Sequence, residues 1–311
     1  MEFRSVLRDV GRRIPQRNRR AGSEKNTRRV SDASGNTPPS RRSGHPGNFI
    51  DESYRHDSLM SSFRHSVSRW CFPKISLPEL AVAARALGID SVELLEPEEW
   101  PVVRPHGVIC AMARGPDTIT DSFNRRENHA RLVPAFKQRL RDCAAAGVPN
   151  VVCFSGNRAG QSDAEGLEIC AEGFRQLVGP AEETGVTLCL ELLNSKIDHP
   201  DYQCDHTAWG VELCRRVGSE RFKLLYDIYH MQIMEGDIIR TIQQNHAYIG
   251  HYHTAGNPGR HEIDDSQELN YPAIMRAIAK TGFRGFVGQE FVPERDPLTS
   301  LREAVQLCSV R

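Results

Sequence analysis

Residues 222–227, FKLLYD, form a short apolar run that ends on a carboxylate. The same pattern occurs three more times: residues 186–191 read VTLCLE, 249–253 read IGHYH and 286–290 read FVGQE. The closing residues lie 36, 26 and 37 positions apart, and they are Glu191, Asp227, His253 and Glu290. One strand with its helix takes about 30 residues in an eight-fold βα barrel, since about 250 residues make eight units. The spacing therefore predicts four successive parallel strands of such a barrel.

The four closing residues predict a metal site at the mouth of this barrel, where the carboxyl ends of the strands converge and active sites lie. Three carboxylates and one imidazole suit Mn²⁺, Mg²⁺ or Co²⁺, with Zn²⁺ possible. We therefore expect one divalent ion at Glu191, Asp227, His253 and Glu290. Glu191 and Glu290 can flank a substrate, and two carboxylates can remove and return a proton beside a carbonyl. We predict catalytic roles for these two glutamates.

The upstream sequence supplies the other half of the barrel. From Phe63 to the end there are 249 residues, the usual size of one barrel. Strands are predicted at 65–72, 91–96, 107–112 and 150–156, because these runs are nearly continuously apolar, as buried parallel strands are. Helices are predicted at 77–88, after a cap at Asp121 or Ser122, and after a cap at Ser162 or Asp163. The predicted fold class is α/β, an eight-stranded (β/α)8 TIM barrel.

Residues 1–62 differ in composition from the remainder. They carry 13 Lys and Arg against 7 Asp and Glu, they are rich in Ser, Gly, Asn and Pro, and they show no apolar periodicity. Such a segment cannot bury enough surface to offset its ordering entropy. The Arg-Arg pairs are not followed by the apolar region that an export signal needs. We predict a disordered basic tail over 1–62 and a barrel domain over 63–311.

Composition favours a small-molecule enzyme over several other classes. The net charge is zero and the pI is about 7.2, which gives no sign of a nucleic-acid partner. There is no run of 18 apolar residues, so we expect no membrane span. The nine cysteines include no C-x-x-C pair, and they indicate reduced core residues of a cytoplasmic protein. A homo-oligomer is compatible with the sequence.

Several strings carry a resemblance to a known family. Residues 227–237 read DIYHMQIMEGD, 249–264 read IGHYHTAGNPGRHEID and 267–271 read QELNY, with ELLNS at 191–195 and GQEF at 288–291. Together they resemble the hydroxypyruvate isomerase group. That group belongs to the xylose isomerase-like barrel superfamily, with the ketose 3-epimerases and endonuclease IV.

The resemblance implies an enzyme that moves a carbonyl along a small substrate, most simply hydroxypyruvate to tartronate semialdehyde, through an enediolate. It implies metal ligands at the four strand-end residues and substrate contacts from His230. Arg260, in a predicted mouth loop, suits an anchor for a carboxylate or hydroxyl through its planar fork.

Two departures from the group keep alternatives open. His253 stands where a typical hydroxypyruvate isomerase has glutamine, and histidine there is the habit of ketose 3-epimerases. DDSQELNY stands where the typical isomerase has Gly-Thr-Gly before its Glu-Ile-Asn-Tyr. A ketose 3-epimerase is therefore the second reading. An endonuclease IV-like phosphodiesterase would need extra histidines for three zinc ions, and a catalytically silent barrel would not need four charged strand ends.

Overall fold

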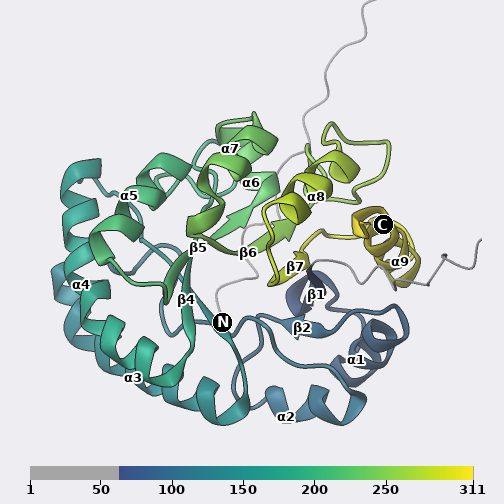
Figure 1. Cartoon of the computed structure of the whole chain (residues 1–311), viewed down its shortest axis with the longest axis horizontal. Helices are drawn as coiled ribbons and strands as arrows, with labels where there is room; N and C mark the ends of the chain where they lie inside the picture. The colour runs from purple at the N-terminus through teal and green to yellow at the C-terminus, as the bar shows by residue number, and fades with distance from the viewer. Residues whose placement is uncertain (1–62, 311) are drawn as a thin grey trace, which may run out of the picture. The chain divides into compact units, whose positions relative to one another are not determined.

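A computed structural model describes residues 63–310, so the predicted disorder of residues 1–62 falls outside the described part of the chain. The described residues form a curved parallel sheet with helices packed on its outer side (Figure 1). The strands are β1 (Arg64–Ser68), β2 (Ser91–Glu93), β3 (Asn150–Cys153), β4 (Thr187–Glu191), β5 (Phe222–Asp227), β6 (Ile249–Thr254) and β7 (Phe286–Gln289).

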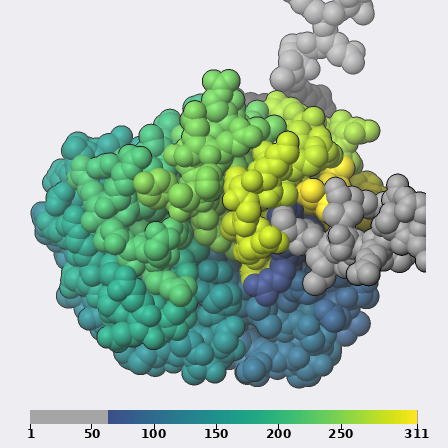
Figure 2. Space-filling model, viewed as in Figure 1, coloured from purple at the N-terminus to yellow at the C-terminus, as the bar shows by residue number. Residues whose placement is uncertain are grey.

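The strands are ordered β2-β1-β7-β6-β5-β4-β3, and every neighbouring pair is parallel. The first and last strands pair directly, with Ser66 opposite Gly288. In the space-filling view this is where purple atoms of the early chain meet yellow atoms of the late chain (Figure 2). The chain therefore curls around on itself, as a barrel requires.

The predicted strand at 107–112 lies between β2 and β3 but forms no regular ladder. Only isolated bridges occur there, joining Ile109 to Ser91 and Ala113 to Val151. The backbone of Ala111 is occupied by side chains instead: its N–H donates to Ser91 Oγ at 2.8 Å, and its carbonyl accepts from Asn150 Nδ2 at 2.8 Å. The barrel prediction is confirmed, with seven regular strands and an irregular segment in the eighth position.

The helices follow the strands in alternation. They are α1 (Leu77–Ala86), α2 (Trp100–Val103), α3 (Arg126–Ala146), α4 (Asp163–Thr184), α5 (Thr207–Val217), α6 (Ile228–Met234), α7 (Ile238–Asn245), α8 (Tyr271–Lys280) and α9 (Pro297–Cys308), with short 3₁₀ turns η1 (Arg69–Cys71), η2 (Arg104–His106) and η3 (His246–Tyr248).

Two of the predicted helix starts can be compared with the structure. Ser162 caps α4 by accepting from the Glu165 N–H, as predicted. The predicted cap of α3 at Asp121 or Ser122 is wrong, because α3 begins only at Arg126. The Ser122 hydroxyl is used elsewhere: it contacts Asp117 Oδ2 at 2.6 Å and the Phe154 carbonyl at 2.8 Å.

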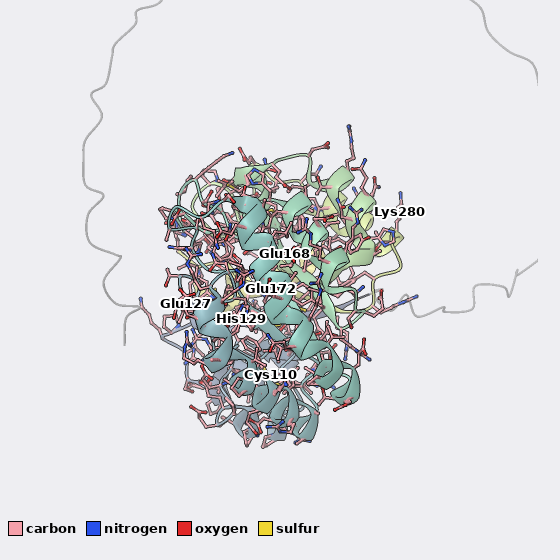
Figure 3. All side chains as sticks on the ribbon, turned by 90° about the vertical axis from the view of Figure 1, so that its left-hand side faces the viewer. Cys110, Glu127, His129, Glu168, Glu172 and Lys280 are labelled. Carbon is pink, nitrogen blue, oxygen red and sulfur yellow. The ribbon has the colours of Figure 1, made fainter. Side chains whose placement is uncertain are left out.

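The apolar core has two parts that together position the site. The larger part lies between the sheet and the helices, and the outer faces of those helices are charged, as Glu168 and Glu172 of α4 show (Figure 3). The smaller part fills the inside of the barrel with Met112, Val152, Cys189 and Leu225. Residues alternate between the two faces of a strand, so residues two positions apart point into the same space. All nine cysteines are buried and free, as predicted for core residues.

Candidate active site

The four predicted ligands meet at the carboxyl ends of four adjacent strands. Glu191 ends β4, Asp227 ends β5, His253 lies next to the end of β6, and Glu290 directly follows β7. All four are buried, and one ligand atom from each lies within 4.8 Å of the others. The sequence spacing predicted this convergence, and the parallel register explains it, since Asp227 and His253 are direct partners in the β5–β6 ladder.

His253 lies at the centre of the cluster. Its Nδ1 atom is 2.9 Å from Glu290 Oε2 and 3.5 Å from Glu191 Oε1. This buried nitrogen nevertheless has no partner in hydrogen-bonding geometry. Burial would lower the pKa of the imidazole, but Glu290, Glu191 and Glu93 outweigh burial and hold the pKa well above its ordinary value. The surroundings of this ring are therefore strongly electronegative and suited to a cation.

Asp227 is held by the start of the following helix. Its Oδ1 accepts from the backbone N–H groups of Tyr229, at 2.9 Å, and His230, at 3.3 Å, which makes it the N-cap of α6. Because the cap occupies Oδ1, Oδ2 faces the cluster, where Arg260 contacts it. Burial raises the pKa of this carboxyl to about 7, although Arg260 opposes the rise. A bound cation would offset this desolvation and keep the group ionised.

Arg260 reaches the cluster from the loop after β6, as predicted. Its guanidinium donates to Glu290 Oε2 at 2.6 Å and to Asp227 Oδ2 at 3.1 Å. It also contacts His230 Nε2 at 2.8 Å, and the rings of Trp70 and Tyr229 flank it at 5.3 Å each. The arginine thus lies beside the acidic groups, where an anionic substrate would also meet it.

The loop that carries Arg260 holds this residue in an unusual backbone conformation. Arg260 has φ of +60°, a left-handed conformation that ordinary residues seldom adopt. Hydrogen bonds from Arg260 N to Gly256 O and from Val292 N to Arg260 O hold it there. A side chain at Gly256 would come within 2.2 Å of the Glu262 carbonyl, so this tight loop needs glycine. Backbone strain of this kind concentrates at functional sites.

His230 is also brought into the site. It lies on α6, fully buried, with Nδ1 2.6 Å from Asn194 Nδ2. Burial and the nearby Arg260 charge hold its pKa well below the ordinary value, so the ring is neutral. A neutral imidazole between fixed neighbours can hydrogen-bond a substrate oxygen, which is the role that the resemblance implies.

The two predicted catalytic glutamates have different surroundings. Glu290 accepts from Trp70 Nε1 at 2.8 Å and from Arg260, whereas Glu191 has His253 as its close polar contact. Burial raises the pKa of Glu191. Burial would also raise the pKa of Glu290, but His253 and Arg260 reverse the effect and hold it well below the ordinary value. Two carboxyl groups in such unlike environments are typical of acid–base pairs.

A divalent cation fits this donor set. The mutual distances of up to 4.8 Å are close to those between ligands around a single ion bonded at about 2.0–2.2 Å. The buried Nδ1 of His253 has no hydrogen-bond partner and faces the carboxylates, as a ligand atom would. Three carboxylates with one imidazole form the mixed oxygen and nitrogen set expected for Mn²⁺ or Co²⁺.

Glu93 is the residue that sequence reasoning missed. It lies in β2, fully buried, and its carboxylate contacts both His251, at 3.1 Å, and His253, at 2.9 Å. A signal was available in the sequence, because a carboxylate inside a buried strand must have a partner. Its partners come from β6, far along the chain, so the sequence alone did not identify them. Trp70 is also near the site: it is 43% exposed, and its Nε1 donates to Glu290 Oε1.

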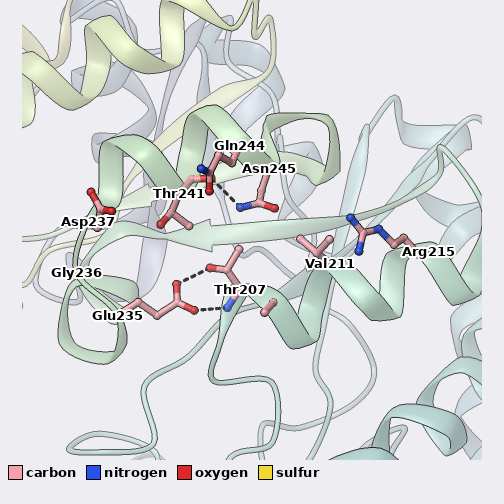
Figure 4. A pocket seen from close by; sticks show the side chains of 10 residues that line it. Thr207, Val211, Arg215, Glu235, Gly236, Asp237, Thr241, Gln244 and Asn245 are labelled. Carbon is pink, nitrogen blue, oxygen red and sulfur yellow. Dashed lines mark hydrogen bonds between the residues drawn. The ribbon is translucent and has the colours of Figure 1, made fainter.

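A separate pocket of about 450 Å³ lies outside the barrel mouth, along α5 and α7 (Figure 4). Its Glu235 carboxylate is already engaged by the N–H of Thr207 at 2.6 Å and by its hydroxyl at 2.7 Å. None of the six predicted site residues lines it. The buried strand-end cluster, and not this pocket, is therefore the candidate active site.

Known proteins resemble the chain in sequence over most of the described barrel. The family described as Xylose isomerase-like TIM barrel matches residues 81–309. A putative hydroxypyruvate isomerase of Homo sapiens is 28% identical over 264 residues, which is 78% of this chain and 94% of the relative. The hydroxypyruvate isomerase of Escherichia coli is 30% identical over 185 residues, 57% of this chain and 71% of that enzyme. The prediction of an isomerase-type enzyme is confirmed by these relatives.

Solved structures agree on the fold. A Brucella melitensis protein named AP endonuclease, family 2, has a TM-score of 0.68 at 25% identity, covering 78% of this chain and 97% of that one. D-psicose 3-epimerase from Clostridium cellulolyticum has a TM-score of 0.63 at 18% identity, covering 78% and 90%. Within residues 63–310, no helix is both long and apolar enough to cross a membrane.

Proposed function

The chain belongs to the xylose isomerase-like TIM barrel family, and we propose that it is a metal-dependent isomerase that interconverts hydroxypyruvate and tartronate semialdehyde. The observation that carries the proposal is the buried cluster of Glu191, Asp227, His253 and Glu290, with one ligand atom from each within 4.8 Å of the others. These four residues would hold one divalent ion, with Mn²⁺, Mg²⁺ or Co²⁺ suited and Zn²⁺ possible. The proposed location is the cytoplasm.

The reaction needs a proton moved between neighbouring carbons. In hydroxypyruvate a glutamate removes a proton from the C3 hydroxymethyl group, which gives an enediolate. The other glutamate delivers a proton to C2, and the C3 hydroxyl proton passes to the C2 oxygen, so that the carbonyl ends on C3. When bound, a divalent cation supplies positive charge that stabilises the enediolate. Glu191 and Glu290 both lie beside His253 Nδ1, so they can act on neighbouring atoms of one substrate.

Two further residues would bind and orient the substrate. Arg260 offers a planar fork suited to the substrate carboxylate. His230 is neutral, and its Nε2 lies beside Arg260, so it can accept a hydrogen bond from a substrate hydroxyl bound there. Burial of the cluster also excludes bulk water, which would otherwise protonate the enediolate without direction.

The proposal is tested by incubating chelator-treated protein with hydroxypyruvate before and after addition of Mn²⁺. We expect tartronate semialdehyde to form only with the metal, and Asp227→Asn to abolish the response. Asp227→Asn is informative because it removes a ligand charge and leaves the residue size almost unchanged. Formation of product at full rate by the metal-free protein would contradict the proposal.

A ketose 3-epimerase is the second candidate, and His253 is the observation that favours it. Histidine is the habit of the epimerases at this position, and the imidazole is positioned as a ligand rather than displaced from the cluster. The same two glutamates would then remove and return a proton at a single carbon on opposite faces. Assaying a panel of ketoses beside hydroxypyruvate separates the two: conversion of a ketose without conversion of hydroxypyruvate would favour the epimerase.

A further inference from the structure

A buried contact crosses the inside of the barrel below the four strand ends. Glu93 projects from β2 and meets two histidines of β6, which lies across the barrel and is not adjacent to β2 in the sheet. Glu93 Oε1 is 2.9 Å from His253 Nε2, and Glu93 Oε2 is 3.1 Å from His251 Nε2. All three side chains are fully buried.

The contact decides which nitrogen of His253 carries a proton. A carboxylate accepts hydrogen bonds and donates none, so Glu93 favours a proton on Nε2 of His253. In the neutral ring the lone pair then lies on Nδ1. That is the atom that faces Glu191 and Glu290, and it is the nitrogen without a hydrogen-bond partner.

Gly288 leaves the space that this contact needs. Gly288 of β7 lies opposite His253 in the β6–β7 ladder. A side chain at Gly288 would come within 2.1 Å of Glu93 Oε1 and 2.9 Å of His253 Cδ2. Glycine at this position therefore leaves the room through which the Glu93 carboxylate reaches the imidazole. Its backbone φ is not in the left-handed region, so this glycine is needed for space rather than for its conformation.

We propose that Glu93 is a positioning residue, which fixes the tautomer and orientation of His253 so that Nδ1 can bind the divalent cation. The inference rests on the proposed metal-dependent function. It assigns no chemical step to Glu93, which touches neither the other three ligands nor a substrate position. His251 shares the carboxylate and keeps it directed toward β6. Carboxylate partners of this kind typically change metal affinity by about 10–100-fold when they are removed.

The first experiment measures Mn²⁺ binding calorimetrically on the full chain after chelator treatment. We expect Glu93→Gln to bind Mn²⁺ about 10–100-fold more weakly than the wild type, because the amide loses the charge and one of two acceptor oxygens. Asp117→Asn is the matched control, since it makes the same change at a half-buried carboxyl group outside the cluster. It should keep wild-type affinity, and the melting temperatures of the metal-free proteins will show that all variants are folded.

The second experiment reads the hydrogen bond directly. In ¹⁵N-histidine-labelled protein bound to Zn²⁺, the His253 ring should carry its proton on Nε2, and the chemical shift of this Nε2–H group should change in Glu93→Gln, where an amide oxygen replaces the carboxylate. An unchanged Nε2–H shift would contradict a contact from Glu93 that orients the ring.

Gly288→Ala tests the contact between Glu93 and His253 without changing Glu93 itself. The added methyl group must displace the carboxylate or the imidazole, so Mn²⁺ affinity should fall as it does in Glu93→Gln. Gly179→Ala, in α4, is its control, because an added side chain there meets nothing within 4 Å.

The outcomes separate this inference from the proposed function. If the wild type binds no Mn²⁺, the metal-dependent function fails and the inference fails with it. If the wild type binds Mn²⁺ and Asp227→Asn does not, but Glu93→Gln keeps wild-type affinity and an unchanged Nε2–H shift, then the metal site stands and the role of Glu93 is wrong.

Discussion

The two halves of the barrel are built differently. In the half from β4 to β7, the four strands have four to six residues, and each ends on or beside a member of the acidic cluster. In the half from β1 to β3, β2 has three residues and the segment before β3 forms only isolated bridges. This half contributes Glu93 and Trp70, which contact His253 and Glu290. Under the proposed function, one half therefore supplies the metal ligands and the two glutamates, and the other supplies residues that orient them.

The largest expected effect is on the two glutamates of the β4–β7 half. Glu191→Gln and Glu290→Gln should each lower turnover of hydroxypyruvate by roughly 10²–10⁴, because each removes one partner of the proton transfer. Weaker Mn²⁺ binding should accompany the loss, so the assay is run at saturating Mn²⁺. Asp117→Asn, in the other half, should retain wild-type turnover. Wild-type turnover by either glutamate variant would contradict the claim that the β4–β7 half carries out the proton transfer.

A pH effect on stability is expected from the β1–β3 half. Burial lowers the pKa of His65 in β1 to about 4, so the native ring resists protonation while the unfolded ring titrates near 6.5. The unfolded state then binds more protons between these values, and stability falls as the pH drops from about 6.5 to about 4. The loss should reach at most roughly 3 kcal/mol. Urea unfolding across this range measures it.

The control for that measurement is His65→Leu, which has no titrating ring at this position. The variant should show a flatter dependence of unfolding free energy on pH than the wild type. An identical slope in the two proteins would mean that His65 does not control this part of the curve. Because His65 is not one of the four residues of the strand-end cluster, Mn²⁺ affinity at neutral pH should not change in the variant.

Arg260→Ala should show whether the β4–β7 half recognises an anion. Loss of the guanidinium removes a charge-assisted contact to a substrate carboxylate, worth roughly 2 kcal/mol or about 30-fold in kcat/KM. A neutral ketose should lose less, since only hydroxyl contacts are affected. The informative quantity is the ratio of the two losses, measured with Mn²⁺ saturating. Equal losses for both substrates would argue against a carboxylate anchor.

Trp70→Phe should give the smallest effect and tests the supporting half. The change removes the N–H that donates to Glu290 Oε1 at 2.8 Å and keeps most of the ring. A hydrogen bond whose donor is partly open to solvent, as Trp70 is, contributes roughly 1 kcal/mol, so kcat should fall by about fivefold. An effect as large as that of Glu290→Gln would instead place Trp70 in the catalytic machinery.

The same contrast explains what the sequence could predict. The four strand ends were predictable because regular βα units place the end of every strand at the same mouth, so spacing alone located Glu191, Asp227, His253 and Glu290. His230 and Arg260 were identified through strings shared with a known family. The irregular segment near Ala111 was not predictable, since the backbone groups of Ala111 bond to the side chains of Ser91 and Asn150 rather than to the backbone of β2 and β3.

Glu93 escaped sequence reasoning for a related reason. Its role depends on a contact across the barrel to residues about 160 positions later, and on the space left by Gly288. No local pattern reports either condition. The false cap at Ser122 has the same origin, because its hydroxyl is engaged by Asp117 and Phe154 rather than by a helix. Local periodicity predicted the helices and strands. The hydrogen-bond partners of the polar side chains depended instead on contacts between segments that are far apart in the sequence.

The central claim is that one divalent ion at the strand-end cluster enables proton transfer by Glu191 and Glu290. The most direct measurement titrates chelator-treated protein with Mn²⁺ in D₂O and follows deuterium entry at C3 of hydroxypyruvate. The account predicts that exchange is absent without metal, rises linearly to one equivalent of Mn²⁺ and then stays constant. Exchange at full rate without metal, or no exchange at saturating Mn²⁺, would contradict it.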